Sequence, residues 1–269
     1  MKRFVKLLCM AICISLFVAA TVPTLEVEAK GKKQASVTPE QQYLNNLILY
    51  RDTLVAMGAA PSEIEKANQA IVSYQANMAQ MAAQAAALAA YQASMANIEK
   101  TLQSGLKKST RGVIFVGDSR FVQMHQAMGE TGVNYVAQGW MGYDWLKDTA
   151  IPQIDPFVGK GSKIVINLGV NDIDNIDNYI ALVNQKAAEW NAKGAKVYYA
   201  TVNPVAEDFP KFKNFRVEEF NNKLKSQLIG VNIIDTYSFL KSYGYELVDH
   251  VHYKGTTSFN IYAYIMSQL

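Results

Sequence analysis

The sequence predicts an α/β domain that begins near residue 109 and follows a segment built only of helices. Between residues 37 and 108 the chain is rich in Ala, Gln, Met and Asn and has no alternating stretch that would make a strand. From residue 111 onward, short β-rich runs alternate with helical runs. Strict alternation of strands and helices is typical of a parallel sheet that is covered by helices on both faces.

Residues 1–29 have the pattern of a secretory signal peptide. A basic start from Lys2 to Lys6 precedes an almost wholly apolar run over residues 7–22, and small residues stand before the expected cleavage point after Ala29. We therefore expect a protein that is secreted or attached to the cell surface, with an uncleaved anchor as the alternative. Both cysteines, Cys9 and Cys13, lie in this segment, so the mature chain would have no disulfide and would depend on its hydrophobic core.

Residues 30–108 are predicted to form two helices. The first runs from about Pro39 to Met57, and the second begins at Ser62, where Glu65 completes a capping box, and reaches about Leu106. We expect a helical hairpin or stalk, with a coil that self-associates through residues 62–106 as the alternative. No charged residue lies between positions 66 and 99. Apolar residues step by three and four along the second helix, as in a heptad seam: Ile64, Ala67, Ile71, Tyr74, Met78, Met81, Ala85, Leu88, Tyr91, Met95, Ile98 and Leu102.

Residues 109–269 hold the candidate strands and the helices that connect them. The strands are expected at residues 113–116, 133–137, 163–168, 196–202 and 231–234. The helices are expected at residues 121–128, 144–149, 176–192, 214–228 and 256–267. Because ligands of such sheets bind beyond the carboxyl ends of the strands, residues at those ends are the first candidates for a functional site.

Residues that can carry chemistry stand at several of these ends. The first strand ends in the run GDSR directly before a helix, so Ser119 is placed either as a nucleophile at the positive end of a helix dipole or as a plain helix cap. Gly139 follows the second strand and Asn171 follows the third, where each can offer a hydrogen-bond donor to a ligand. Near the carboxyl end, Asp249 and His252 are separated by three residues, so the carboxylate can hold the imidazole ring.

Four blocks of the sequence together resemble the SGNH (GDSL) hydrolases over about residues 111–269. They are the GDS block with Ser119, the glycine block with Gly139, the GxND block with Asn171, and the DxxH block with Asp249 and His252. The resemblance implies a flavodoxin-like, three-layer fold and a triad in which the serine is the nucleophile, the histidine is the base and the aspartate orients it. It also implies an oxyanion hole made by the serine and glycine N–H groups and the asparagine side chain.

The sequence departs from the pattern of this family directly after the serine, where Arg120 stands in place of the leucine of many members. We expect Arg120 to meet an anionic substrate or to form a salt bridge at the helix start. Trp140 and Tyr143 follow the glycine block and are candidates for stacking on a sugar ring, with core packing as the alternative. These three residues are the expected substrate contacts.

Charge and composition narrow the function further. The chain has 26 Lys and Arg against 23 Asp and Glu. The resulting net charge of +3 is too small for a chain of this size to form the basic surface that nucleic acid binding requires. No cluster of His, Cys and carboxylates has metal-ligand spacing, so we expect neither a metal nor a cofactor. The sequence thus predicts a secreted serine esterase that removes an acyl group, most simply acetyl, from an acylated glycan through an acyl-enzyme. An O-acyltransferase acting on a cell-wall or surface glycan with the same triad, and a non-enzymatic surface or assembly protein acting through its helices, are the alternatives.

Overall fold

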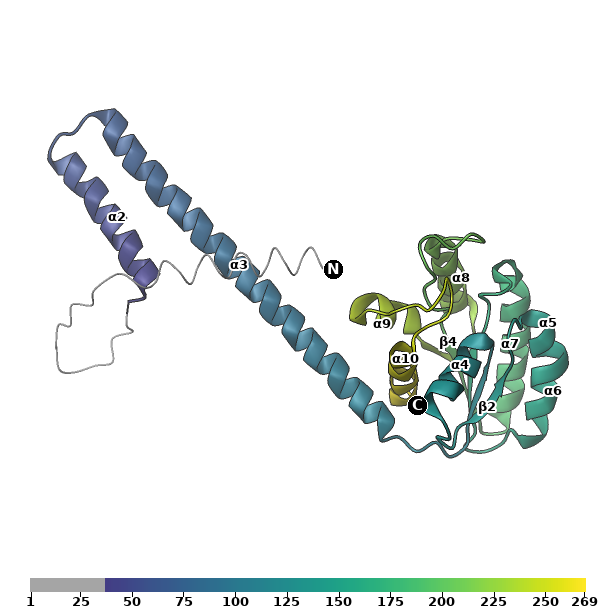
Figure 1. The fold of residues 1–269 in the computed structure, drawn as a ribbon. Helices are drawn as coiled ribbons and strands as arrows, with labels where there is room; N and C mark the ends of the chain where they lie inside the picture. The colour runs from purple at the N-terminus through teal and green to yellow at the C-terminus, as the bar shows by residue number, and fades with distance from the viewer. Residues whose placement is uncertain (1–36) are drawn as a thin grey trace, which may run out of the picture. The chain divides into compact units, whose positions relative to one another are not determined.

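A computed structural model of the chain describes residues 37–269 (Figure 1). The expected signal peptide and both cysteines lie outside the described residues. The chain divides into two compact units, one ending at Ala90 and the other spanning Tyr91–Leu269, and the division falls within a single long helix, α3 (Pro61–Leu106). Among residues 37–269, no helix is both long enough and apolar enough to cross a membrane.

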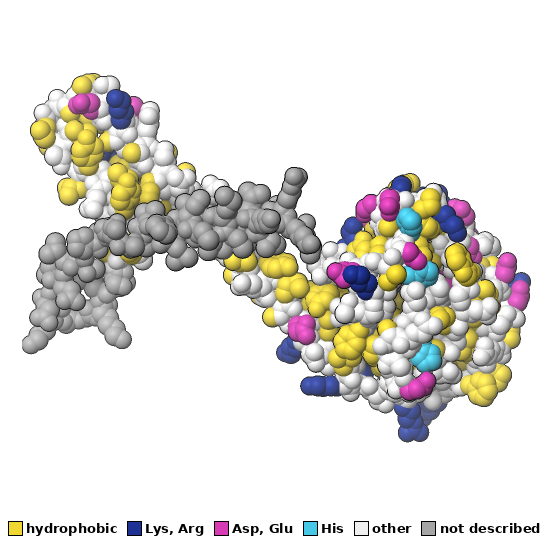
Figure 2. Space-filling model, in the orientation of Figure 1, with side chains coloured by type: hydrophobic (Ala, Val, Ile, Leu, Met, Phe, Trp, Pro, Cys, Tyr) yellow, Lys and Arg dark blue, Asp and Glu magenta, His cyan; other side chains and the backbone are white. Residues whose placement is uncertain are grey.

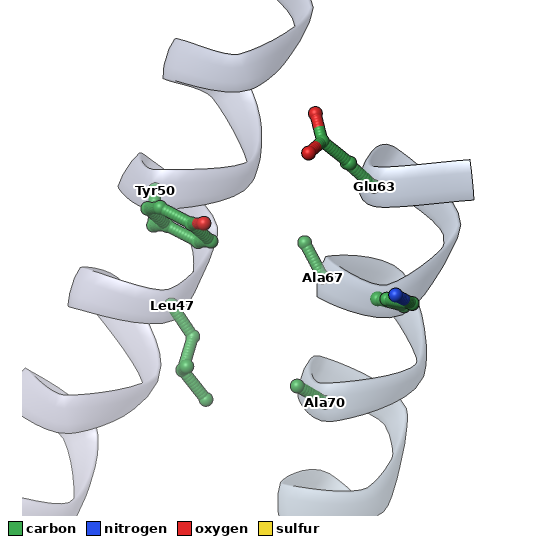
Figure 3. Close-up of a pocket in the computed structure, with 6 residues that line it drawn as sticks. Leu47, Tyr50, Glu63, Ala67 and Ala70 are labelled. Carbon is green, nitrogen blue, oxygen red and sulfur yellow. The ribbon is translucent and has the colours of Figure 1, made fainter. Parts of the chain in front are cut away.

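The first unit is a helical hairpin of α2 (Pro39–Ala56) and the first half of α3. Ala67 and Ile71 are buried between the two helices, and the rings of Tyr43 and Tyr74 lie 4.8 Å apart. A hollow between the helices is lined by side chains from both of them (Figure 3), namely Leu47, Tyr50, Glu63, Lys66, Ala67 and Ala70. It contains none of the residues of the expected catalytic site.

The start of α3 differs from the sequence prediction. The carbonyl of Ala60 accepts hydrogen bonds from the N–H groups of Glu63 and Ile64, and the helix begins at Pro61. Proline suits this first position because its missing N–H would have no partner there. Ser62 therefore lies inside the first turn, and the predicted capping box at this residue is wrong.

The heptad seam of α3 is covered at its start and exposed in its middle. Ala67 and Ile71 are buried where α2 packs on the helix, whereas Met81 is 53% exposed and Tyr91 is 59% exposed further along. Self-association through residues 62–106 remains a prediction.

The second unit is built on a five-stranded, wholly parallel sheet in the order β2-β1-β3-β4-β5. Its strands are β1 (Val113–Gly117), β2 (Asn134–Ala137), β3 (Lys163–Asn167), β4 (Lys196–Ala200) and β5 (Val231–Ile234). After β1 the chain moves to one side for β2 and then crosses to the other side for β3. The carboxyl ends of β1 and β3 therefore form the switch point at which ligands bind in open α/β sheets.

Helices cover both faces of the sheet (Figure 1). One core lies under α5 (Tyr143–Trp145), α6 (Ile151–Ile154), α7 (Ile176–Ala192) and α8 (Asn214–Gln227). The other lies under α4 (Ser119–Met128), α9 (Thr236–Tyr243) and α10 (Gly255–Ser267). This three-layer arrangement confirms the predicted fold class.

Two helical regions differ from their predicted form. The helix expected at 144–149 is divided into α5, a π turn over Leu146–Ala150, α6 and a 3-10 turn over Asp155–Phe157. Helix α9 is absent from the prediction, although Asp235 caps it by accepting a hydrogen bond from the N–H of Ser238. A second 3-10 turn, Ile173–Asn175, follows β3.

The last turns of α3 pack on the α/β unit. Leu102 is 3% exposed, and a Cβ atom placed on Gly105 would lie 1.8 Å from the carbonyl oxygen of Ala263 in α10. The hydroxyl of Tyr243 in α9 also donates to Glu99. A glycine at position 105 thus lets two helix backbones approach closely. The domain boundary expected at residue 109 remains a prediction.

Candidate active site

Ser119 is the first residue of α4 and follows β1 after a single capping residue. Asp118 has extended backbone angles, and its Oδ1 accepts a hydrogen bond from the N–H of Arg120 at 2.9 Å. The ring of Phe121 packs against Gly117. A Cβ atom at position 117 would lie 2.6 Å from this ring, so the position needs a glycine. The run GDSR therefore makes a tight strand-to-helix turn that presents Ser119 at the carboxyl edge of the sheet, next to the positive end of a helix.

His252 is held in a short turn that Asp249 organises. Oδ1 of Asp249 accepts the N–H groups of Val251 and His252, both at 2.8 Å. Its Oδ2 lies 2.7 Å from Nδ1 of His252. Nε2 of the same ring lies 2.8 Å from Oγ of Ser119, a residue 133 positions earlier in the sequence. The three side chains thus form one continuous line of hydrogen bonds.

The surroundings of Asp249 favour its ionised form. Partial burial alone would raise the pKa of the Asp249 carboxyl, but hydrogen bonds from the His252 ring and from two backbone N–H groups outweigh it and lower the pKa to about 2. The carboxylate accepts the proton on Nδ1, which leaves Nε2 free to accept the hydroxyl proton of Ser119. This geometry can activate a serine for attack on a carbonyl carbon.

Gly139 and Asn171 lie on the two loops beside the serine. A Cβ atom placed on Gly139 would lie 4.0 Å from Cβ of Ser119, so the backbone of this glycine comes close to the serine. The side-chain amide of Asn171 donates to the carbonyl of Met141 at 2.9 Å. The amide has a second N–H, which is left for a ligand.

Sequence reasoning missed Asp172, the residue after Asn171. Its carboxylate accepts hydrogen bonds from the N–H of Tyr143 at 2.7 Å and from the hydroxyl of Tyr179 at 2.8 Å. A Cβ atom on Gly142 would lie 2.5 Å from this carboxylate, which explains the glycine. Asn171 and Asp172 together fix the loop of residues 138–143, and the GxND block was the signal that pointed to this position.

Trp140 is the most exposed aromatic residue at the site. It is 78% exposed. Among residues 37–269 it is also the one residue other than glycine whose backbone has a positive φ, 65°. Nζ of Lys211 lies 5.8 Å from the centre of its ring. A strained backbone that holds a large apolar side chain in solvent is a feature found at binding sites. Tyr143, by contrast, packs edge-on against Tyr179 at 5.7 Å, so core packing describes this residue.

Arg120 does not occupy either of its predicted positions. It is 5% exposed, its Nε donates to the carbonyl of Val251 at 3.2 Å, and its guanidinium lies 5.8 Å from the centre of the Tyr253 ring. No carboxylate lies within ion-pair distance of it among the described residues. The side chain turns inward along the histidine turn, so it is neither a salt bridge at the helix start nor open to a substrate.

The two remaining histidines lie outside this line of hydrogen bonds. The ring of His125 stacks on Tyr135 at 4.4 Å, and His250 lies 3.8 Å from the Asp208 carboxylate at the rim. Figure 2 shows histidine side chains beside carboxylates on one face of this unit. Within residues 37–269, no group of three or more His, Cys, Asp or Glu is arranged to hold a metal ion.

Solved structures similar to this chain include acyl-transferring and acyl-hydrolysing proteins. A GDSL-like lipase from Bacteroides thetaiotaomicron is 16% identical over 65% of this chain and 97% of its own, with a TM-score of 0.46. The catalytic domain of peptidoglycan O-acetyltransferase A from Streptococcus pneumoniae is 20% identical over 56% of this chain and 88% of its own, with a TM-score of 0.42. An acetylxylan esterase from Geobacillus stearothermophilus is 16% identical over 57% of this chain and 91% of its own, with a TM-score of 0.39.

No protein-family profile and no curated protein sequence matches the chain. The chemistry of the site is therefore inferred from the geometry of Ser119, His252 and Asp249.

Proposed function

We propose that the protein is an extracellular serine esterase that hydrolyses a carbohydrate ester, most simply an acetyl ester. The observation that carries the proposal is the line of hydrogen bonds from Asp249 through His252 to Ser119, with separations of 2.7 and 2.8 Å, at the carboxyl end of β1. A helix cap needs no such partners, so the alternative role for Ser119 does not account for the histidine and the aspartate.

In the proposed reaction, His252 carries the proton at each step. Oγ of Ser119 bonds to the ester carbonyl carbon while its proton passes to Nε2 of His252, and Asp249 stabilises the imidazolium that results. The C–O bond to the alcohol then breaks, and His252 returns the proton to the leaving oxygen. Water next gives a proton to His252 and attacks the acyl group, which leaves as a carboxylic acid when the proton returns to Ser119.

The negative charge on the carbonyl oxygen needs donors that are in place before the reaction. We assign this role to the N–H groups of Ser119 and Gly139 and to the amide of Asn171. The closeness of Gly139 to Ser119 and the anchoring of Asn171 on the Met141 carbonyl support the assignment. Because both loops are fixed by hydrogen bonds, little reorganisation is required when the charge forms.

The alcohol part of the ester is assigned from Trp140. The residue is 78% exposed on the same short loop as Gly139, and Lys211 lies beside its ring. An exposed aromatic ring offers a flat apolar face, which suits the apolar face of a sugar ring better than a flexible acyl chain. The expected signal peptide supports a place outside the cell, where acylated glycans are present, and residues 62–106 are proposed as a segment for self-association.

The test is to treat the protein with a fluorophosphonate probe that reacts with activated serines, and then to measure hydrolysis of acyl esters of graded chain length and of acetylated sugars. We expect labelling at Ser119, loss of labelling in Ser119→Ala, and the highest kcat/KM for acetylated sugars. An unlabelled wild-type protein would instead support the non-enzymatic alternative. Acyl transfer to an added acceptor glycan, at the expense of free acid, would identify an O-acyltransferase.

A further inference from the structure

A buried arginine lies between the two segments that supply the nucleophile and the base. Arg120 follows Ser119 directly, and Val251 directly precedes His252. Nε of Arg120 donates to the carbonyl of Val251 at 3.2 Å, across 131 positions of sequence. Arginine is seldom buried without a carboxylate partner, and this one is 5% exposed. Burial raises the pKa of the adjacent Asp118 carboxyl and the charge of Arg120 opposes that rise, but the two side chains form no ion pair. Its placement therefore needs an explanation beyond the packing of α4.

The contact closes a ring of four links around the catalytic pair. Two links are peptide bonds, from Ser119 to Arg120 and from Val251 to His252. The other two are hydrogen bonds, from Arg120 Nε to the Val251 carbonyl and between Ser119 Oγ and His252 Nε2. In such a ring the position of one hydrogen bond restricts the other, so the arginine contact limits how far the histidine can move from the serine.

Both ends of the arginine contact are themselves held. The backbone N–H of Arg120 is fixed by Oδ1 of Asp118, and the guanidinium lies 5.8 Å from the ring of Tyr253. On the other side, the N–H of Val251 is bound by Asp249. Val251 is thus held at its N–H by the triad carboxylate and at its carbonyl by Arg120, directly before His252.

We propose that Arg120 is a positioning residue that holds His252 at hydrogen-bond distance from Ser119 by fixing the carbonyl of Val251. The proposal rests on the esterase function proposed above, because the placement of His252 affects kcat only if Ser119 and His252 react with a substrate. An apolar side chain at position 120 fills the space, yet it leaves the Val251 carbonyl without its donor. The turn of residues 249–252 would keep the hydrogen bonds from Asp249 and those that the His250 and His252 carbonyls accept from the N–H groups of Ala206 and Val248. It would lose the hydrogen bond that ties its backbone to α4.

The experiment compares Arg120→Met, Arg120→Leu and Arg120→Lys with the wild type and with Arg216→Gln. Arg216 is an arginine of α8 that is paired with Asp174 and Glu219 and serves as the matched control. Each protein is assayed for kcat and KM on a small soluble ester, for the rate of fluorophosphonate labelling, and for its unfolding temperature. All rates are measured well below the lowest unfolding temperature.

We expect Arg120→Met to lower kcat and the labelling rate together by about 10²-fold, as displacement by roughly 1 Å does in other active sites, while KM changes little. Lysine keeps an N–H donor on a long side chain, so Arg120→Lys should recover most of the loss. Arg216→Gln should leave both rates unchanged. This order, with donors better than non-donors, is the result that supports positioning.

Other outcomes overturn the proposal in separate ways. If Arg120→Met has a lower unfolding temperature but wild-type kcat and labelling rate, Arg120 only stabilises the fold. If Arg120→Met does not fold, Arg120→Leu, which also lacks an N–H donor, takes its place, and wild-type rates in that variant lead to the same conclusion. If the wild type is itself neither labelled nor active, the proposed function fails before the role of Arg120 is reached.

Discussion

The side-chain amide of Asn171 donates a hydrogen bond to the backbone carbonyl of Met141, 2.9 Å away. This contact joins the end of β3 to the loop that carries Gly139. One N–H of the amide contacts the loop, and the other is left for a ligand. In the proposed mechanism, a single residue would thus set the position of one oxyanion donor and supply another.

Asn171→Ala should lower kcat by roughly 10²- to 10³-fold, because an oxyanion donor acts in the transition state more than in the ground state. KM on a small ester should stay near its wild-type value. Steady-state kinetics measure both, with Asn178→Ala as the control, since this exposed amide donates to Asn175 on the same helix turn. A variant with weakened binding and normal turnover would make Asn171 a substrate-binding residue instead.

Ser119→Ala should abolish turnover, with a loss on the order of 10⁶-fold if the triad acts as a unit. The fold should persist, because the hydroxyl of Ser119 contacts only the His252 ring among the described residues. Ester hydrolysis and circular dichroism check the two expectations. Ser226→Ala is the matched control, as its hydroxyl binds the Lys223 carbonyl in α8, away from the site. Near-normal turnover in Ser119→Ala would contradict the mechanism.

The sequence was sufficient for the sheet, and it also pointed to Ser119, His252 and Asp249, which the structure brings together, because both depend on local patterns. Strand β5 and helix α7 have the predicted bounds, Val231–Ile234 and Ile176–Ala192. The spacing of Asp249 and His252 places both on one turn, and a serine at a strand end is exposed by the topology of any such sheet.

The contacts that were missed join residues far apart in the chain. Arg120 meets Val251 across 131 positions and Asp172 meets Tyr143 across 29. No local pattern encodes such pairs, because they depend on how loops fold over the carboxyl edge of the sheet. The same is true of Gly105, which gives no sign in the sequence that it contacts Ala263.

Asp249 predicts a specific dependence of stability on pH. Its pKa in the folded protein is about 2, below the ordinary value of 3.8. A lowered folded pKa contributes stability that is fully present above the ordinary value and is lost as the pH falls from there through about 2. Unfolding temperatures of the wild type and Asp249→Asn should therefore converge between these two values.

The size of this effect is limited by exposure, because half of the Asp249 side chain is accessible to solvent. Asp208→Asn serves as the control at the same rim. A gap between wild type and Asp249→Asn that stays constant from neutral pH down to pH about 2 would show that the His252 contact does not lower this pKa.

Trp140→Ala should raise KM for acetylated sugars by about 10-fold, roughly 1.4 kcal/mol of binding, and leave kcat/KM for a p-nitrophenyl ester nearly unchanged. The reason is that a sugar ring meets the exposed indole, whereas a small ester needs only the triad. Phe157→Ala is the control, since this residue is 76% exposed but lies beyond α6, away from the site loops. If kcat/KM falls equally for both substrates, Trp140 instead stabilises the loop that carries Gly139.

The end of α3 should stabilise the catalytic unit without being needed for its chemistry. A fragment starting at Tyr91 keeps the turns of α3 that bury Leu102 in the core beneath α10, whereas a fragment starting at Ser109 loses them. Both should hydrolyse a small ester, because all triad residues lie beyond position 109. The shorter fragment should be less stable by about 2 kcal/mol, the value of burying one leucine side chain.

Substitution at the helix contact tests the same point within the full chain. Gly105→Ala places a methyl group where Ala263 leaves only 1.8 Å, so α3 must shift from α10 and stability should fall, while Gly159→Ala meets no atom within 4 Å and should be neutral. Urea unfolding and ester hydrolysis on the two fragments and the two variants measure stability and turnover separately. If the fragment from Ser109 is soluble and folded but inactive, the end of α3 helps to shape the site through α10, and its role is more than support.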